Sequence, residues 1–152
     1  MSFSERFSLR NVRRLLRLAA AALLCAAPPL PAAEFVLVTA ARGTPFEMRR
    51  ETAEQLYLGR RSTAEDGRQL QLIDLPSGPA RDRFYQLLTG KNASQIRAYW
   101  SRLVFTGRAL PPREAEDAEA VRRLLIQIPN SIGYLSSQDA AEPGLRVLLQ
   151  ID

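Results

Sequence analysis

One short segment of the chain combines residue types that could bind a small anion. It is DLPSGPARDRF, residues 74–84, between an apolar run and a segment of helical spacing. Pro79 suits the first turn of a helix, and Ser77 or Gly78 suits its N-cap. A first helical turn leaves backbone N–H groups unpaired, and these donors, the Ser77 hydroxyl and the helix dipole together favour phosphate or sulfate. Arg81, one turn further on, could add a bidentate charge-assisted contact.

The same segment also has a simpler interpretation. Ser77 and Gly78 could only cap the helix, while Arg81 is solvated. The local sequence leaves both interpretations open.

The first residues are typical of a secretory signal peptide. Residues 1–17 contain five arginines and one acidic residue, and the apolar run LAAAALLCAA and the segment PPLPAA follow. This pattern predicts a signal peptide at residues 1–33, cleaved after Ala33, because the apolar run is too short to span a bilayer comfortably. A lipoprotein signal at Cys25 is the alternative, although Leu24 stands where such signals usually have a small residue. The working domain is then residues 34–152, long enough for one ordinary core.

Composition excludes several classes of function. The chain has 21 basic and 16 acidic residues, of which residues 1–33 hold five and one, so residues 34–152 carry a net charge of about +1. No arginine-rich block remains to bind nucleic acid. The chain has no histidine, and its single cysteine, Cys25, lies in the predicted signal peptide. Without imidazole or thiol groups we expect no catalytic residue, no metal site, no cofactor and no enzyme activity.

The apolar patterns alternate between strand and helix types. Strands are predicted at residues 35–40, 70–75, 130–135 and 145–152, from β-branched or continuously apolar runs. Helices are predicted at residues 48–59, 79–90, 92–105 and 113–129, from helical spacing and from glycine, proline and cap residues. The acidic segment EAEDAE, residues 114–119, is interpreted as a solvated face of the last helix. The resulting order predicts a single α/β domain with a mixed sheet flanked by helices.

Two other motifs have structural and functional interpretations. Tyr99 and Trp100 lie in an amphipathic helix and are expected in the core, with a stacking platform for a sugar or base as the alternative. The segment from Phe105 to Arg108, followed by two prolines, predicts a rigid loop, and such loops can border a cleft.

The motifs in order resemble a known bacterial family. LYLGR, DGRQLQLIDLPSG, RDRFYQLLTGK, AYWSRLVFTGRALPP and NSIGYL follow one another as in the short phosphate ABC transporter substrate-binding-like proteins. These are related to the phosphate-binding periplasmic proteins of the type II binding-protein fold. The likeness covers roughly residues 35–135.

The resemblance implies a periplasmic, non-enzymatic protein that resembles one lobe of a type II periplasmic binding protein. In the larger relatives, phosphate lies between two lobes and is held by backbone N–H groups, hydroxyls, an Arg and an Asp. The positions that match their helix-start motif are Asp74, Ser77 and Gly78, with Arg81 as a substitute cation. The first functional hypothesis is therefore binding of phosphate or a similar oxyanion, linked to ABC-type phosphate transport.

The sequence also departs from the larger relatives, and the departures motivate a second hypothesis. Those proteins have an Arg shortly before the Asp and a Thr after the Ser-Gly pair, whereas here Leu72 and Ile73 precede Asp74 and Pro79 follows Gly78. The chain is about half the length needed for two lobes. The alternative is a binding-protein fold that has lost its ligand and docks a periplasmic or membrane protein. A homodimer could also supply the missing wall of a cleft.

Overall fold

The computed structural model describes residues 33–152, so the predicted signal peptide lies outside the described residues except for Ala33. Within them, no helix is long and apolar enough to cross a membrane. The strands are β1 (Phe35–Ala40), β2 (Gln71–Asp74), β3 (Arg113–Glu114), β4 (Ser131–Ser136) and β5 (Leu145–Ile151). The helices are α2 (Arg50–Tyr57), α3 (Pro79–Thr89), α4 (Ala93–Phe105), α5 (Ala118–Gln127) and the short 3₁₀ helix η1 (Asp139–Ala141).

The strands form one mixed sheet in the order β3-β2-β4-β1-β5. β2 pairs in parallel with β3 and with β4, whereas β1 pairs antiparallel with both β4 and β5. β3 is an edge strand of two residues and pairs only with Ile73 and Asp74. The predicted α/β class with a mixed sheet is therefore confirmed.

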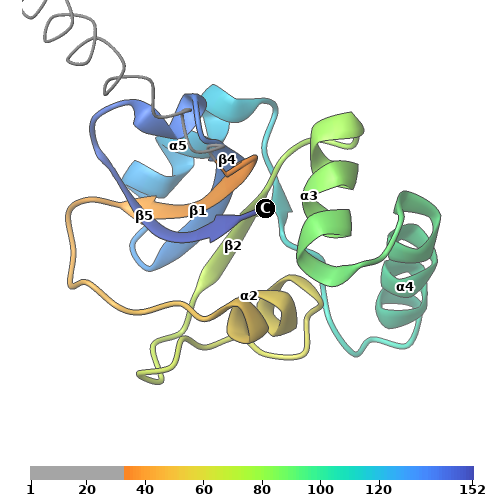
Figure 1. The fold of residues 1–152 in the computed structure, drawn as a ribbon. Coiled ribbons are helices and arrows are strands. Elements are labelled where there is room, and N and C mark those ends of the chain that lie inside the picture. Colours follow the sequence, from red (N-terminus) through yellow and green to blue (C-terminus); the bar gives the residue numbers. More distant parts are fainter. Residues whose placement is uncertain (1–32) are drawn as a thin grey trace, which may run out of the picture. The chain divides into compact units, whose positions relative to one another are not determined.

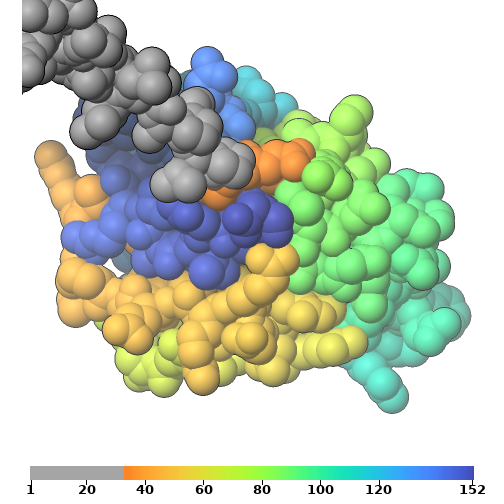
Figure 2. Space-filling model, in the orientation of Figure 1, coloured from red at the N-terminus to blue at the C-terminus, as the bar shows by residue number. Residues whose placement is uncertain are grey.

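Helices cover both faces of this sheet. Gly133 of β4 faces α5, because a Cβ built on it would lie 3.0 Å from Cγ1 of Val121. The next residue, Tyr134, points to the opposite face, where its ring stacks on Phe84 of α3 with ring centroids 3.5 Å apart. α4 packs against α3, and Figure 1 shows α3 and α4 side by side at one end of the sheet. In the space-filling view their side chains form one continuous green surface (Figure 2).

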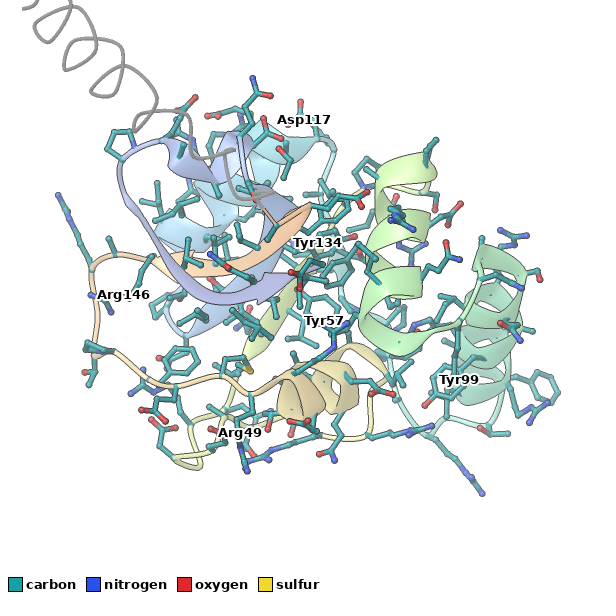
Figure 3. The ribbon with its side chains drawn as sticks, in the orientation of Figure 1. Arg49, Tyr57, Tyr99, Asp117, Tyr134 and Arg146 are labelled. Atoms are coloured by element: carbon teal, nitrogen blue, oxygen red, sulfur yellow. The ribbon has the colours of Figure 1, made fainter. Side chains whose placement is uncertain are left out.

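An aromatic cluster fills the space between the sheet and the helices α2 and α3. Tyr57 contacts Phe84 edge to face, with ring centroids 5.1 Å apart, and lies 5.7 Å from Tyr134. Figure 3 shows Tyr57 and Tyr134 next to each other in the interior, whereas Arg49, Asp117 and Arg146 lie at the periphery. Aromatic pairs in edge-to-face geometry add to the large area that they bury. The cluster fixes α3 against the carboxyl end of β2.

The segment before α5 differs from its prediction. A helix was predicted over residues 113–129, but α5 begins at Ala118, and residues 113–114 form β3. Asp117 is the N-cap, since its carboxylate accepts a hydrogen bond from the N–H of Ala120 at 2.7 Å. Residues 114–117 are therefore the end of a strand, a connection and a helix cap, and only Ala118 and Glu119 of the acidic segment lie in α5. The acidic side chains of the segment are exposed, as predicted.

Candidate functional site

The carboxylate of Asp74 is the centre of a buried polar cluster at the carboxyl end of β2. Asp74 is 1% exposed. Its Oδ1 accepts a hydrogen bond from the Tyr134 hydroxyl at 2.5 Å, and its Oδ2 accepts from the Tyr85 hydroxyl at 3.0 Å. Nε of Arg81 donates to Oδ2 at 2.8 Å and completes an ion pair. All three partners donate, so the arrangement fits an ionised carboxylate.

The charges of this cluster influence one another. Burial raises the pKa of Asp74 above its ordinary value, while Arg81 and the hydroxyl donors oppose the rise. Burial acts to lower the pKa of Arg81, but attraction to Asp74 outweighs it, and the net pKa is raised. Burial and the neighbouring carboxylate raise the pKa of Tyr85 and of Tyr134 well above 10.0. Both tyrosines are therefore neutral donors at ordinary pH.

The predicted anion-binding residues lie together at the start of α3. Gly78 is the N-cap, Pro79 is the first residue of the helix, and no side chain caps it. The Ser77 hydroxyl is exposed and accepts a hydrogen bond from Nη1 of Arg81 at 3.3 Å instead of capping the helix. Arg81 is half-buried and paired with Asp74, so it is not simply solvated.

Two of the three partners of the buried carboxylate, Tyr85 and Tyr134, were not predicted to lie at the site. Tyr134 lies 60 positions from Asp74 and Tyr85 lies 11 positions from it. The same Tyr134 oxygen accepts the N–H of Leu75 at 3.4 Å. The spacing of these residues gives no signal for the contacts, because they depend on β4 lying beside β2 and on α3 folding over both.

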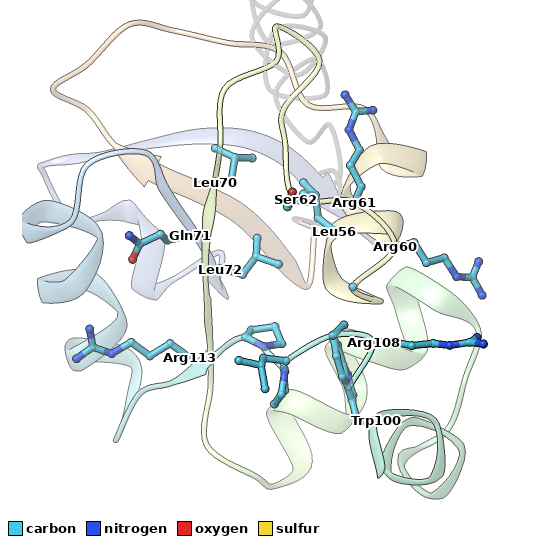
Figure 4. Close-up of a pocket in the computed structure, with 15 residues that line it drawn as sticks. Leu56, Arg60, Arg61, Ser62, Leu70, Gln71, Leu72, Trp100, Arg108 and Arg113 are labelled. Atoms are coloured by element: carbon cyan, nitrogen blue, oxygen red, sulfur yellow. The ribbon is translucent and has the colours of Figure 1, made fainter. Parts of the chain in front are cut away.

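A concave region elsewhere on the surface, here called the arginine groove, has a volume of about 540 Å³. Its side chains come from the end of α2, the start of β2, α4 and the loop before β3 (Figure 4). The lining combines four arginines with apolar residues and contains no Asp or Glu: Leu56, Gly59, Arg60, Arg61, Ser62, Leu70, Gln71, Leu72, Trp100, Arg108, Ala109, Leu110, Pro111, Pro112 and Arg113. Of the segment predicted to be a rigid loop, Arg108 and the two prolines line the groove, whereas residues 105–107 do not.

The wall of the groove is held by close packing around Gly59. This residue has a φ of +64°, and a Cβ on it would lie 2.8 Å from Cη2 of Trp100 and 3.1 Å from the Cβ of Ala109. Trp100 is 6% exposed, which confirms that it packs in the core. Its Nε1–H is the buried side-chain donor that lacks an acceptor among residues 33–152. Tyr99 donates a hydrogen bond to the carbonyl of Leu58 at 2.6 Å and ties α4 to the end of α2.

Within residues 33–152, no group of three or more His, Cys, Asp or Glu side chains is arranged to hold a metal ion. No family model matches the sequence, and the search of curated proteins finds no match.

Solved structures do match the fold. One is an ABC-type phosphate transport receptor from Vibrio cholerae, with a TM-score of 0.57 and 10% identity, covering 76% of this chain and 45% of that one. Another is described as a phosphate ABC transporter substrate-binding protein with bound phosphate, from Clostridium perfringens, with a TM-score of 0.57 and 14% identity, covering 76% of this chain and 44% of that one. The chain is thus a single α/β domain that resembles roughly one lobe of such binding proteins and spans a little under half of their length.

Proposed function

We propose that this chain is a periplasmic solute-binding-like protein that binds phosphate or a similar oxyanion at the start of α3 and is linked to ABC-type phosphate transport. One observation carries the proposal. The Arg81 guanidinium is held by Asp74 beside the exposed Ser77 hydroxyl, at a helix start that no side chain caps. The fold likeness supports it, since both neighbours are described as phosphate transport proteins and one holds phosphate.

The charge balance of the site favours weak binding of an anion. The negative charge of Asp74 would oppose an anion, but it is buried and is neutralised by Arg81. An anion at Ser77 therefore meets a neutral pair, a hydroxyl and the N–H groups of the first turn, which together favour negative charge. Since Ser77 is exposed, water weakens every contact. We expect a millimolar affinity from one lobe and a higher one if a second copy or a partner covers the site.

Isothermal titration with inorganic phosphate tests this proposal. We expect 1:1 binding, weakened several-fold by Ser77→Ala. Ser101→Ala is the matched control, because Ser101 is an exposed serine of α4 outside the site. Arg81→Lys keeps the charge but loses the fork of donors, so it should weaken binding while the protein stays folded by circular dichroism. No heat of binding at tens of millimolar phosphate, in protein shown to be folded, would contradict the proposal.

A second candidate function is a docking module with the fold of a binding protein but no ligand. Exposed apolar side chains near the end of α4 favour it, since Phe105 is 92% exposed and Leu110 is 82% exposed. Single exposed apolar residues are ordinary, but Leu110 also lines the arginine groove, and exposed apolar surface at a concave region is typical of an interaction surface. A pull-down from periplasmic extract should recover a protein that Phe105→Ser or Leu110→Ser releases. Recovery of no partner, together with measurable phosphate binding, would decide against it.

A further inference from the structure

The arginine groove carries positive charge that the described residues do not neutralise. Arg60, Arg108 and Arg113 are exposed and Arg61 is partly exposed, and none of the four forms an ion pair within residues 33–152. Nη2 of Arg61 donates to the carbonyl of Ala64 at 2.7 Å, so part of that guanidinium is used within the turn. Figure 4 shows Arg60 and Arg108 extending on one side of the groove and Arg113 on the other. An occupant would meet positive charge on both sides.

The floor of the groove is apolar. Leu72 supplies accessible apolar surface between the arginines, with the buried Leu56 and Leu70 packed behind it, and Pro111 and Pro112 stiffen the loop. Leu110 lines the same groove and is 82% exposed, so the apolar surface continues beyond the hollow. A small inorganic anion would use the arginines and leave this apolar surface uncovered. The lining therefore fits an occupant that combines carboxylates with an apolar side chain.

The groove also lies along an incompletely paired strand edge. β2 pairs with β4 through Gln71 and Leu72, but β3 covers the other side of β2 only at Ile73 and Asp74. Gln71 and Leu72 both line the groove. The N–H of Gln71 already donates to the carbonyl of Asn130 on the β4 side, and the N–H of Leu70 donates to the carbonyl of Ser62, each at 2.9 Å. The open part of this edge is therefore short, and an extended peptide in the groove would be held mainly by its side chains.

From these observations, we propose that the arginine groove binds an extended acidic segment of a partner protein, with one apolar side chain packed against Leu110 and carboxylates beside Arg60 and Arg108. The groove is formed before binding, because Gly59, Trp100 and Ala109 hold the loop against α2 and α4. A preformed groove lowers the ordering cost of binding. This surface lies at the start of β2, whereas the proposed oxyanion site follows the end of β2. The groove proposal is therefore independent of the oxyanion site, and it assigns a ligand chemistry to the surface around Leu110 that the alternative docking module would use.

Fluorescence anisotropy with a labelled hexapeptide of sequence EDLFDE tests the proposal, with QNLFNQ as the uncharged probe of equal shape. We expect saturable binding of EDLFDE and at least tenfold weaker binding of QNLFNQ. The double variant Arg60→Gln/Arg108→Gln should weaken binding of EDLFDE at least tenfold. The pair Arg97→Gln/Arg102→Gln is the control for net charge, because it also removes two charges from exposed arginines of α4 that do not line the groove, and it should change binding less than twofold.

Further measurements distinguish an acidic peptide from a small anion or a second copy of the chain as the occupant of the groove. Leu110→Ser should weaken EDLFDE several-fold, whereas Ser77→Ala should leave it unchanged. Absence of peptide binding, equal binding of both peptides, or equal losses in Arg97→Gln/Arg102→Gln and in Arg60→Gln/Arg108→Gln would overturn the proposal. Glutarate or inorganic phosphate displacing the peptide at equimolar concentration would instead make the groove a small-anion site. Self-association of the chain, lost in the double variant by analytical ultracentrifugation, would assign the groove to a second copy and also overturn it.

Discussion

Replacing Tyr134 with phenylalanine removes one oxygen atom from the buried cluster around Asp74. In the native protein this hydroxyl donates to Oδ1 of Asp74 at 2.5 Å and accepts the N–H of Leu75 at 3.4 Å. Tyr57→Phe is a matched comparison, because its hydroxyl donates only to the neutral carbonyl of Ile73 at 3.1 Å. Both tyrosines are 0% exposed, so both substitutions leave a similar small void.

The two substitutions should differ in their effect on stability because one partner is charged. A hydrogen bond to a charged group contributes about 1.5–3 kcal/mol, and a neutral one about 0.5–1.5 kcal/mol. We therefore expect Tyr134→Phe to lower the free energy of unfolding by about 1 kcal/mol more than Tyr57→Phe does. Urea unfolding measures this, with the fluorescence of Trp100, the single tryptophan, as the probe. The comparison is valid where the denaturant slope is unchanged.

A double-mutant cycle then tests the assigned partner. Asp74→Asn removes the charge and leaves Arg81 without its ion-pair partner. It should lower the free energy of unfolding by about 3 kcal/mol, which is the lower end of the range for breaking a buried pair, because Arg81 is partly exposed. In that background, the cost of Tyr134→Phe should fall to the value of a neutral hydrogen bond. Equal costs for Tyr134→Phe and Tyr57→Phe, or no change in the Asp74→Asn background, would refute the charge-based account of the cluster.

Other predictions concern the helix ends and the tyrosines. Gly59→Ala should lower the free energy of unfolding by about 2–4 kcal/mol, because the strain of a left-handed φ adds to overpacking against Trp100. Gly90→Ala, at a φ of +71° with open space around it, should lower it by about 1–2 kcal/mol. Equal losses in chemical denaturation would contradict the packing around Gly59. Asn92→Ala should lower stability by about 1 kcal/mol, since its side chain caps α4 in a capping box; an unchanged unfolding midpoint would contradict the cap. Burial raises the pKa of Tyr57, Tyr85 and Tyr134 above 10.0 in the folded protein. Their contribution to the free energy of unfolding is therefore complete below pH 10.0 and declines as pH rises above it. Tyrosinate absorbance should therefore develop only with alkaline unfolding for Tyr57, Tyr85 and Tyr134; their ionisation in folded protein would contradict this.

A pH-dependent prediction concerns Glu65. Its pKa is lowered by hydrogen bonds from Arg49 and then from Thr52. Its folded pKa is below the unfolded value of 4.5, so its contribution to stability is present above that pH and is lost as pH falls through the folded pKa. NMR titration of the Glu65 carboxyl should give a midpoint below 4.5, and Thr52→Val should raise it. A midpoint unaffected by Thr52→Val would contradict the contact of 2.8 Å between Thr52 Oγ1 and Glu65 Oε1.

Much of the fold could be predicted from short stretches of sequence. The helix predicted over residues 92–105 is α4, and the side chain of Asn92 at its start accepts the N–H of Gln95 at 3.0 Å. The helix predicted to start at Pro79 does so and ends before Gly90, which has a left-handed φ of +71°. These features depend on contacts within one helical turn. The strand β3 was missed because Arg113 and Glu114 are extended only through pairing with Ile73 and Asp74, about forty residues earlier.

The candidate sites also combine features that the local sequence predicts with features that depend on distant residues. The sequence by itself determined that Ser77, Gly78 and Arg81 lie together at a helix start, because they lie within one turn of each other along the chain. Only the tertiary structure decided that Arg81 is bound to a buried Asp74, since that contact requires Tyr134 from β4 and Tyr85 from α3 around the carboxylate. The arginine groove likewise joins four separate segments. Helix starts depend on local backbone geometry, whereas burial and charge pairing depend on which distant segments the hydrophobic core brings into contact.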